Sequence, residues 1–486
     1  MARQHRQGHG TATGLAALVA VAAVAFLLCF APFDRPVVLD PATWDYMSVE
    51  MASTGMVPHR DIFVHKTPLA ALLGAAGAKV SLTLGGDALT GAHAAYLLVA
   101  ALGPALLFLI CLKSFSLPTA LAAAAFMMAF DQWPVAAVEG VRPKMATTVF
   151  GLASLLAALR GRPLGAGFFG ALATWCWQPG LAFALGAMWE LRGRWLYNGA
   201  RLAIGAALPT AALLLWLGMS GALDDFFRQA LLFNFDYIGH HARSPTGTLL
   251  HLYQLAKFWN PVEGLLLLVA LAGLVLSRGQ GAGLPRGLMA ATLAYTAMTF
   301  VSLQAWPDTI LFVPGLSALL AGGLAGIGYG WSRKRGRWTN TAIQAAIVVV
   351  ALAMALSPHS KRLHPPISFD EQAAFMEGLA TGLKESDSVL VVSLPEFLIH
   401  QQRRSRWPWP YLWFGVDRFA DQHSPGGFKA LLKGLEADPP GLMLVARRWS
   451  GEHRKDFETW ARTRYRRQRV YFYPHTRRPI NVYRPF

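Results

Sequence analysis

This chain is dominated by a series of long apolar segments separated by polar turns and loops. Each segment is apolar over a length that approaches or reaches that of a membrane-spanning helix. About eleven such segments occur, near residues 13–30, 89–111, 116–130, 143–159, 163–177, 180–191, 199–218, 260–277, 287–304, 309–330 and 339–357. Hydrophobic residues make up 54% of the chain and charged residues only 15%, which is too apolar for an ordinary soluble protein. The sequence therefore predicts a mainly α-helical, polytopic membrane protein with about eleven transmembrane helices.

Basic residues indicate how these segments are oriented. Lys and Arg collect in every second turn, at Lys113, Arg160–Arg162, Arg192–Arg201, Arg278–Arg286 and Arg333–Arg337. Cytoplasmic loops of membrane proteins carry an excess of Lys and Arg. The pattern therefore predicts a cytoplasmic N-terminus, with residues 31–88 and the C-terminus on the outer side. Much of the formal net charge of +17 is then explained by topology.

The composition changes after Leu356. Residues 358–486 are polar and have no apolar run of membrane length, so we expect a transmembrane domain over 1–357 and a small external α/β domain after it. Its expected elements are a helix over Phe369–Leu383 and buried strands at Ser388–Ser393 and Gly441–Ala446. The basic run Arg462–Arg469 would suggest nucleic acid, but an external domain meets none. We expect no nucleic-acid partner and interpret this run as a solvated helix face.

Ionisable residues cluster in the predicted first outer loop, residues 31–88. Between residues 40 and 69 of this loop, Asp40, Asp45 and Asp61 lie with two histidines, an arginine and a lysine. Charged groups beside a membrane are costly and indicate a functional site. Asp40 is suited to act as a general base or to hold a divalent cation such as Mg²⁺ or Mn²⁺. Asp45 is a second catalytic candidate, although it could instead cap the helix through Tyr46–Thr54 or be solvated.

Basic residues near these acids suit a phosphate. Arg60, His65 and Lys66 follow in the same loop, and for Arg60 contact with an anionic lipid headgroup is an equal alternative. The next outer turn adds Glu139, Arg142 and Lys144. Glu139 could be a second carboxylate, sharing a metal with Asp40, and Arg142 and Lys144 could bind phosphate. Alternatively, Glu139 and Arg142 neutralise each other. Asp308, at a later outer corner, could line the same cavity.

The first outer loop resembles that of GT-C-fold glycosyltransferases, in particular the bacterial relatives of protein O-mannosyltransferases and of lipid A aminoarabinose transferase. The residues that carry the resemblance are Asp40, Tyr46, Gly55, Pro58, Arg60, Asp61, His65, Lys66 and Pro68. The turn at Gln178-Pro179 and the late prolines Pro307 and Pro314 are also similar to the family.

The resemblance implies that a sugar is transferred, with inversion, from a polyprenyl-phosphate carrier to a lipid, glycan or protein acceptor. It implies a multi-pass enzyme of the bacterial inner membrane that works on the periplasmic face, with Asp40 as the catalytic acidic residue. Tyr46, Asp61 and Gln178 are the further substrate-binding candidates. The family's second acidic residue is replaced by Pro41. A catalytically inactive scaffold or binding protein is therefore one alternative, and a transporter of a lipid-linked substrate is another.

Overall fold

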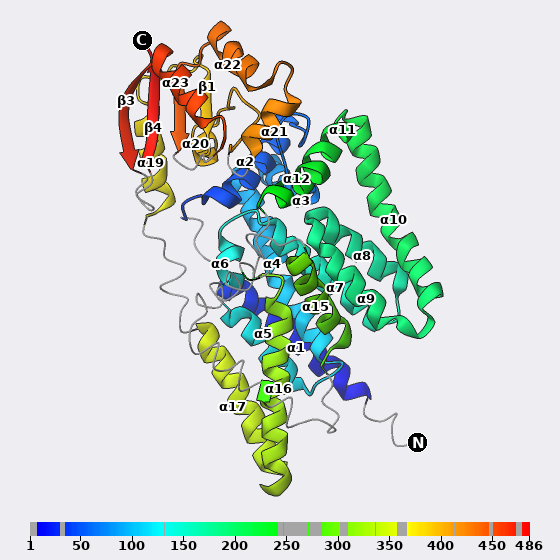
Figure 1. The fold of residues 1–486 in the computed structure, drawn as a ribbon. Coiled ribbons are helices and arrows are strands. Elements are labelled where there is room, and N and C mark those ends of the chain that lie inside the picture. The colour runs from blue at the N-terminus through cyan, green and yellow to red at the C-terminus, as the bar shows by residue number, and fades with distance from the viewer. Residues whose placement is uncertain are drawn as a thin grey trace.

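The computed structural model describes most of the chain in two parts, a large helical part and a small α/β part that follows it (Figure 1). The residues described are 7–29, 35–130, 132–241, 246, 271–272, 284–301, 310–335, 337–356, 367–412, 415–446, 451–472 and 479–486.

The helical part follows the predicted apolar segments closely. Its α-helices are α1 Gln7–Cys29, α2 Leu39–Thr54, α3 Leu69–Thr83, α4 Ala88–Cys111, α5 Leu117–Ala129, α6 Gln132–Val138, α7 Pro143–Leu159, α8 Pro163–Cys176, α9 Leu181–Glu190, α10 Trp195–Met219, α11 Leu223–Phe226, α12 Phe233–His241, α15 Arg286–Val301, α16 Val313–Arg335 and α17 Arg337–Leu356. Two short 3₁₀ turns, η1 Gln178–Gly180 and η2 Arg192–Arg194, and a π-helical turn, η3 Phe227–Leu232, connect some of them.

Local sequence explains several helix boundaries. Pro143 and Pro163 begin α7 and α8, where the missing N–H of proline costs nothing because the first helical N–H groups have no partner within the helix. At the other end of a helix, Gly55 follows α2 with a φ of 73°, a left-handed conformation that glycine adopts without strain.

The predicted number of membrane crossings is not confirmed. Among the described residues, two helical stretches are long and apolar enough to cross a membrane, Ala88–Cys111 and Arg192–Met219. A third crossing results if α5 and α6, which are bent by 60°, form one span. The other apolar helices are shorter, and the predicted segment 260–277 lies almost entirely outside the described residues. The positions of the helices thus agree with the sequence, while the count of eleven spans remains a prediction.

Small residues let the helices pack closely. A Cβ atom on Gly167 of α8 would lie 1.8 Å from the Leu202 carbonyl oxygen of α10, and one on Gly205 of α10 would lie 2.0 Å from the Leu164 carbonyl oxygen of α8. Helices in a membrane gain little from the hydrophobic effect and associate mainly through such close van der Waals contact. The crossing of α8 and α10 therefore requires glycine at both positions.

The α/β part contains one four-stranded sheet in the order β1-β2-β4-β3. Strand β1 is parallel to β2, and β4 is antiparallel to both β2 and β3. The elements of this part are α19 Phe369–Ala380, β1 Val389–Val392, α20 Pro395–His400, α21 Val416–His423, α22 Gly427–Ala437, β2 Leu442–Ala446, α23 Arg454–Arg464, β3 Tyr465–Phe472 and β4 Pro479–Pro485.

The helix α19 and the strands β1 and β2 lie where the sequence predicts them. The interpretation of Arg462–Arg469 as one helix face is wrong, because α23 ends at Arg464 and the chain continues as β3. The reason is a contact distant in sequence: β3 pairs with β4, with Tyr465 opposite Pro485 and Arg467 opposite Tyr483.

The α/β part packs directly on the first outer loop, close to α2 (Figure 1). The Phe63 N–H donates to the Pro408 carbonyl oxygen at 2.9 Å, and Phe63 lies in an aromatic cluster with Trp409 and Phe419. Glu50 of α2 forms an ion pair with Arg404 at 2.6 Å. The two parts are therefore joined by both polar and apolar contacts at the loop that carries most of the predicted site.

We predict that Gly167→Ala or Gly205→Ala will lower the stability of the helical part by about 1–3 kcal/mol, because the added methyl group forces α8 and α10 apart. The matched control is Gly218→Ala, also in α10, where nothing lies within 4 Å of the added Cβ. Thermal unfolding of the detergent-purified protein measures the effect. Equal unfolding midpoints for Gly167→Ala and Gly218→Ala would contradict the assigned packing.

Candidate active site

Asp40 lies in the first turn of α2, where the helix dipole favours a negative charge. Its side chain is 54% exposed, and one carboxylate oxygen lies 3.6 Å from a guanidinium nitrogen of Arg142. Burial by the surrounding protein would by itself raise the pKa of Asp40, but the charges of Lys66, Lys144 and Arg142 outweigh this effect. They hold the pKa well below its usual range. Asp40 is therefore an ionised carboxylate that solvent can reach and that several cations surround.

The two lysines near Asp40 are held by aromatic rings. The ammonium group of Lys66 lies 4.9 Å from the centre of the Trp44 ring, and that of Lys144 lies 5.7 Å from the Trp177 ring. A cation over an aromatic face is stabilised without being neutralised. Both lysines thus stay charged while the rings hold them in place. Lys66 is only 5% exposed, so its position is well defined.

Arg142 connects the two predicted outer loops. It forms an ion pair with Glu139, as the sequence alternative suggested, and its other terminal nitrogen approaches Asp40. Arg35, which the sequence analysis did not identify, interacts electrostatically with Glu139. Among the residues that the structure describes, four basic side chains accompany two carboxylates in this region, two more positive than negative charges. This excess favours an anion such as a phosphate group.

These residues do not fit the divalent cation expected between Asp40 and Glu139. Both carboxylates already lie against Arg142, so a metal would have to displace a guanidinium and add charge to a region that is already positive. Within the described part of the chain, no group of three or more His, Cys, Asp or Glu side chains is arranged to hold a metal ion.

Side-chain amides fix the backbone of the first outer loop. The amide nitrogens of Gln178 and Asn234 donate to the His65 carbonyl oxygen at 3.4 and 2.6 Å. Gln229 accepts from the Val64 N–H at 3.0 Å and donates to the His59 carbonyl oxygen at 2.8 Å. Side chains of η1, η3 and α12 therefore hold the backbone that precedes Lys66 and so position this lysine. Of these three amides only Gln178 was among the residues predicted from the sequence, although Gln229 and Asn234 stand out as polar residues within the apolar stretch 226–235.

His65 connects the site to the α/β part. Its Nδ1 atom is hydrogen-bonded to the hydroxyl group of Tyr411. Burial, with a further contribution from Lys66, lowers the pKa of His65 to about 3, so the imidazole is neutral near pH 7. Tyr411 was missed by the sequence analysis, although the run Trp407-Pro-Trp-Pro-Tyr411 is unusually rich in aromatic residues and proline.

Asp45 is buried beneath the site. Its side chain is fully inaccessible, accepts a hydrogen bond from the Val141 N–H at 2.8 Å and lies 3.1 Å from the His93 Nε2 atom of α4. Gly140, at a φ of 109°, leaves room for it: a Cβ there would lie 2.6 Å from an Asp45 oxygen. The cap and solvated interpretations are both wrong, because α2 begins at Leu39 and no solvent reaches the carboxylate. Asp45 instead holds the turn that presents Arg142 to Asp40.

Three other predicted residues lie outside this cluster. Tyr46 is 6% exposed and belongs to the apolar core that α2 shares with the α/β part. Arg60 and Asp61 form a bidentate ion pair, and Arg60 also donates to the Ser220 carbonyl oxygen. The geometry does not support substrate contact by these three, because their polar groups are engaged in the loop or buried. Asp308 lies outside the described residues.

No protein-family model matches the chain, and no curated protein sequence matches it. Solved structures do match. ArnT from Cupriavidus metallidurans in the apo state aligns over 97% of this chain and 98% of its own, at 14% identity and a TM-score of 0.61. The same protein bound to undecaprenyl phosphate aligns over the same shares at 15% identity, with a TM-score of 0.58.

The archaeal oligosaccharyltransferase AglB from Archaeoglobus fulgidus, in complex with an inhibitory peptide and a dolichol-phosphate, also matches. It aligns over 95% of this chain and 73% of its own, at 11% identity and a TM-score of 0.52. Another structure of this oligosaccharyltransferase is a complex with Zn and sulfate. ArnT and AglB are membrane proteins with the GT-C fold, and this chain has the same fold. The fold expected from the first outer loop is thus confirmed.

We predict that Asp45→Ala will destabilise the protein by about 3–5 kcal/mol, because it leaves His93 and the Val141 N–H buried without their partner. Asp224→Ala, at an exposed position of α11, is the control. Both are compared with the wild type by thermal unfolding in detergent. Unfolding of Asp45→Ala at the wild-type temperature would show that the carboxylate has no structural role.

We predict that stability decreases as the pH falls from about 6.5 toward 3. Burial lowers the pKa of both His59 and His65 to about 3. Between these values the unfolded chain binds a proton at each histidine and the folded chain does not, so acid favours unfolding. Each histidine contributes a slope of up to about 1.4 kcal/mol per pH unit.

His59→Asn tests this prediction, since asparagine tolerates the left-handed backbone at this position, where φ is 72°. The variant should show a shallower dependence of the unfolding free energy on pH than the wild type, whatever its stability at neutral pH. Equal slopes would mean that His59 titrates normally in the folded protein.

Proposed function

We propose that this protein is an integral membrane glycosyltransferase that moves a sugar from a polyprenyl-phosphate carrier to an acceptor. The observation that carries the proposal is the ionised Asp40 carboxylate surrounded by Lys66, Arg142 and Lys144. The fold shared with ArnT bound to undecaprenyl phosphate and with AglB in complex with a dolichol-phosphate supports the lipid-phosphate donor.

The cations would bind the phosphate of the donor. Lys66 and Lys144 supply point charges and Arg142 a planar guanidinium, and together they stabilise the charge that develops on the leaving phosphate. His65 adds a neutral donor: if the Tyr411 hydroxyl donates to Nδ1, then Nε2 carries the hydrogen and can donate to a phosphate oxygen.

Asp40 would act as the general base. As the acceptor hydroxyl or amine attacks the anomeric carbon, the bond from that carbon to the phosphate oxygen breaks, the lipid phosphate leaves with the electron pair, and Asp40 takes the acceptor proton. The donor phosphate would also affect the basicity of Asp40. By binding the cations that lower the pKa of Asp40, it raises that pKa and makes the carboxylate more basic once the donor is bound.

The same proposal assigns roles to the two parts of the chain. Residues 1–357 form the catalytic transmembrane domain in the bacterial inner membrane, with the N-terminus cytoplasmic. Residues 358–486 form the periplasmic domain, which positions His65 through Tyr411. The sugar and the acceptor, whether lipid, glycan or protein, are to be identified by experiment.

A non-catalytic scaffold that only binds the lipid-linked sugar is the second candidate. The observation that favours it is the absence of a second free carboxylate beside Asp40 among the described residues. Pro41 follows Asp40, Asp45 is buried, and Glu139 is paired with Arg142. A transporter is less well supported, since the ionisable residues of the site gather in the outer loops rather than in mid-span.

We predict that Asp40→Asn will reduce sugar transfer by about 10²–10⁴-fold, the usual contribution of a general base, while donor binding is retained. Lipid-reconstituted protein is incubated with a panel of radiolabelled polyprenyl-phosphate sugars and a membrane extract. Asp224→Asn is the control, an aspartate-to-asparagine change at an exposed position that is predicted to lie on the same side of the membrane. Transfer and donor binding are measured for each protein.

Label that moves into a new product with the wild type and Asp224→Asn, but not with Asp40→Asn, supports the transferase and identifies the donor. Full transfer by Asp40→Asn contradicts the role of Asp40. Tight donor binding without transfer by any of the three proteins supports the scaffold instead.

A further inference from the structure

A groove lies far from the candidate active site, where α9 and α10 meet through η2. This is the end of α10 opposite to α11 and the α/β part (Figure 1). The groove has a volume of about 410 Å³, within the range of small-molecule sites. It is lined by Leu185, Met188, Trp189, Arg192, Trp195 and Ala290.

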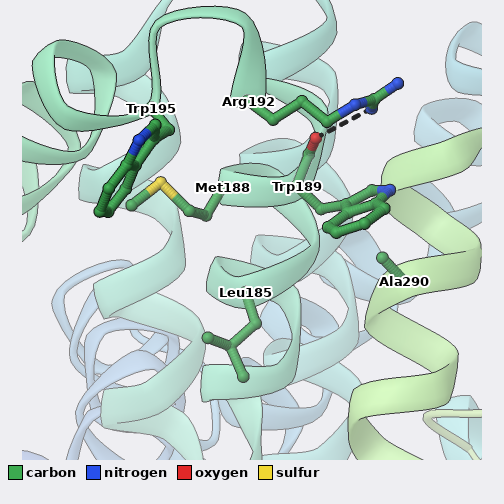
Figure 2. Close-up of a pocket in the computed structure, with 6 residues that line it drawn as sticks. All are labelled: Leu185, Met188, Trp189, Arg192, Trp195 and Ala290. Atoms are coloured by element: carbon green, nitrogen blue, oxygen red, sulfur yellow. Dashed lines mark hydrogen bonds between the residues drawn. The ribbon is translucent and has the colours of Figure 1, made fainter.

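The lining is almost entirely apolar. Figure 2 shows Trp195 on one side and Trp189 on the other, with Met188 and Leu185 between them. The two tryptophans are 62% and 55% exposed, and Leu185 is 48% exposed. Apolar side chains this large and this open, close together on one surface, mark a place where another apolar group is bound.

The surroundings of the groove indicate a membrane. It adjoins α10, whose outward residues Leu196, Ile204 and Leu208 are all more than 60% exposed along a helix long enough to cross a bilayer. Tryptophan is enriched where hydrocarbon meets the lipid headgroups. The basic turn η2 predicts that this is the cytoplasmic boundary.

Arginines at the rim provide a charge that the apolar lining lacks. Arg192 lies over the Trp189 ring at 5.4 Å and donates to the Trp189 carbonyl oxygen at 3.2 Å (Figure 2). Arg194 follows two residues later and is exposed, and Arg201 belongs to α10. Within the described ranges, no carboxylate forms an ion pair with any of these three arginines. Their charge is therefore available to an anion at the membrane surface.

We propose that this groove binds an anionic membrane phospholipid such as phosphatidylglycerol. An acyl chain lies between Trp189 and Trp195, over Met188 and Leu185, and the phosphate of the headgroup lies beside Arg192 and Arg194. A free phosphate would leave the apolar lining of the groove uncovered. A zwitterionic lipid has no net negative charge to balance the arginines at the rim. The proposal is independent of sugar transfer and requires only that the protein lies in a membrane.

The test is native mass spectrometry of the full-length protein in detergent, with equal amounts of phosphatidylglycerol and phosphatidylcholine added. We expect the wild type to retain phosphatidylglycerol preferentially. Arg192→Gln should lower its retention about fivefold, and Arg192→Gln with Arg194→Gln about 25-fold, since a basic residue near an anionic lipid contributes about 1 kcal/mol. Arg160→Gln, in a different basic turn, is the matched control and should retain it as the wild type does.

Met188→Trp separates the groove from a general attraction to basic residues, because it fills the space for the acyl chain and leaves every arginine in place. Retention should fall at least tenfold. Ala290→Leu, on the α15 wall, fills the groove from the other side in case Met188→Trp does not fold, and thermal unfolding verifies the fold of each variant. Equal retention of phosphatidylglycerol by the wild type, Arg192→Gln and the folded filling variant overturns the proposal. Equal retention of both phospholipids by the wild type, or retention of an added polyprenyl phosphate in place of phosphatidylglycerol, also overturns it.

Discussion

The attraction between Asp40 and the cations around it organises this molecule. Lys66, Arg142 and Lys144 come from two separate segments, the first outer loop and the start of α7, and would repel one another without a carboxylate among them. Each segment is therefore held by contacts of its own. Gln178, Gln229 and Asn234 bind the backbone of the loop, and buried Asp45 binds the turn before α7. Among the described residues the assembled cluster holds more cations than carboxylates, a balance that suits an anionic ligand.

The α/β part contributes contacts to the candidate site in addition to having a sheet and a core of its own. Tyr411 contacts His65, and the Pro408 carbonyl oxygen accepts from the Phe63 N–H within the same loop. Arg404 pairs with Glu50 on α2, the helix that begins beside Asp40. A change in how the α/β part packs would therefore shift both His65 and α2, the helix that carries Asp40.

The helical part supports the site through close packing of small residues. Glycines at the crossings of α8 with α10 and of α9 with α15 let backbones approach until a methyl group no longer fits. These crossings hold η1, with Gln178, against the first outer loop, and they also place Trp189, Trp195 and Ala290 around the groove at the opposite end of α10. The two proposed ligand sites, one for a lipid-linked sugar and one for a phospholipid, thus depend on the same helix contacts.

The helices, the first outer loop and the candidates Asp40, Lys66, Arg142 and Lys144 could be predicted from local patterns along the chain. Apolar periodicity, prolines at helix starts and charges in outer turns are local signals, and they were sufficient for the fold class and for about half of the candidate residues.

Which of these residues meet depends on long-range packing that local patterns do not contain. Asp45 is buried against His93, Arg60 reaches the Ser220 carbonyl oxygen, Tyr46 lies in the core, and Tyr411 contacts the loop across more than three hundred residues. Long-range packing also ends α23 at Arg464, because β4 offers a strand partner. Such contacts depend on how whole helices and sheets pack, and a polar side chain looks the same in the sequence whether it faces a substrate or a neighbouring helix.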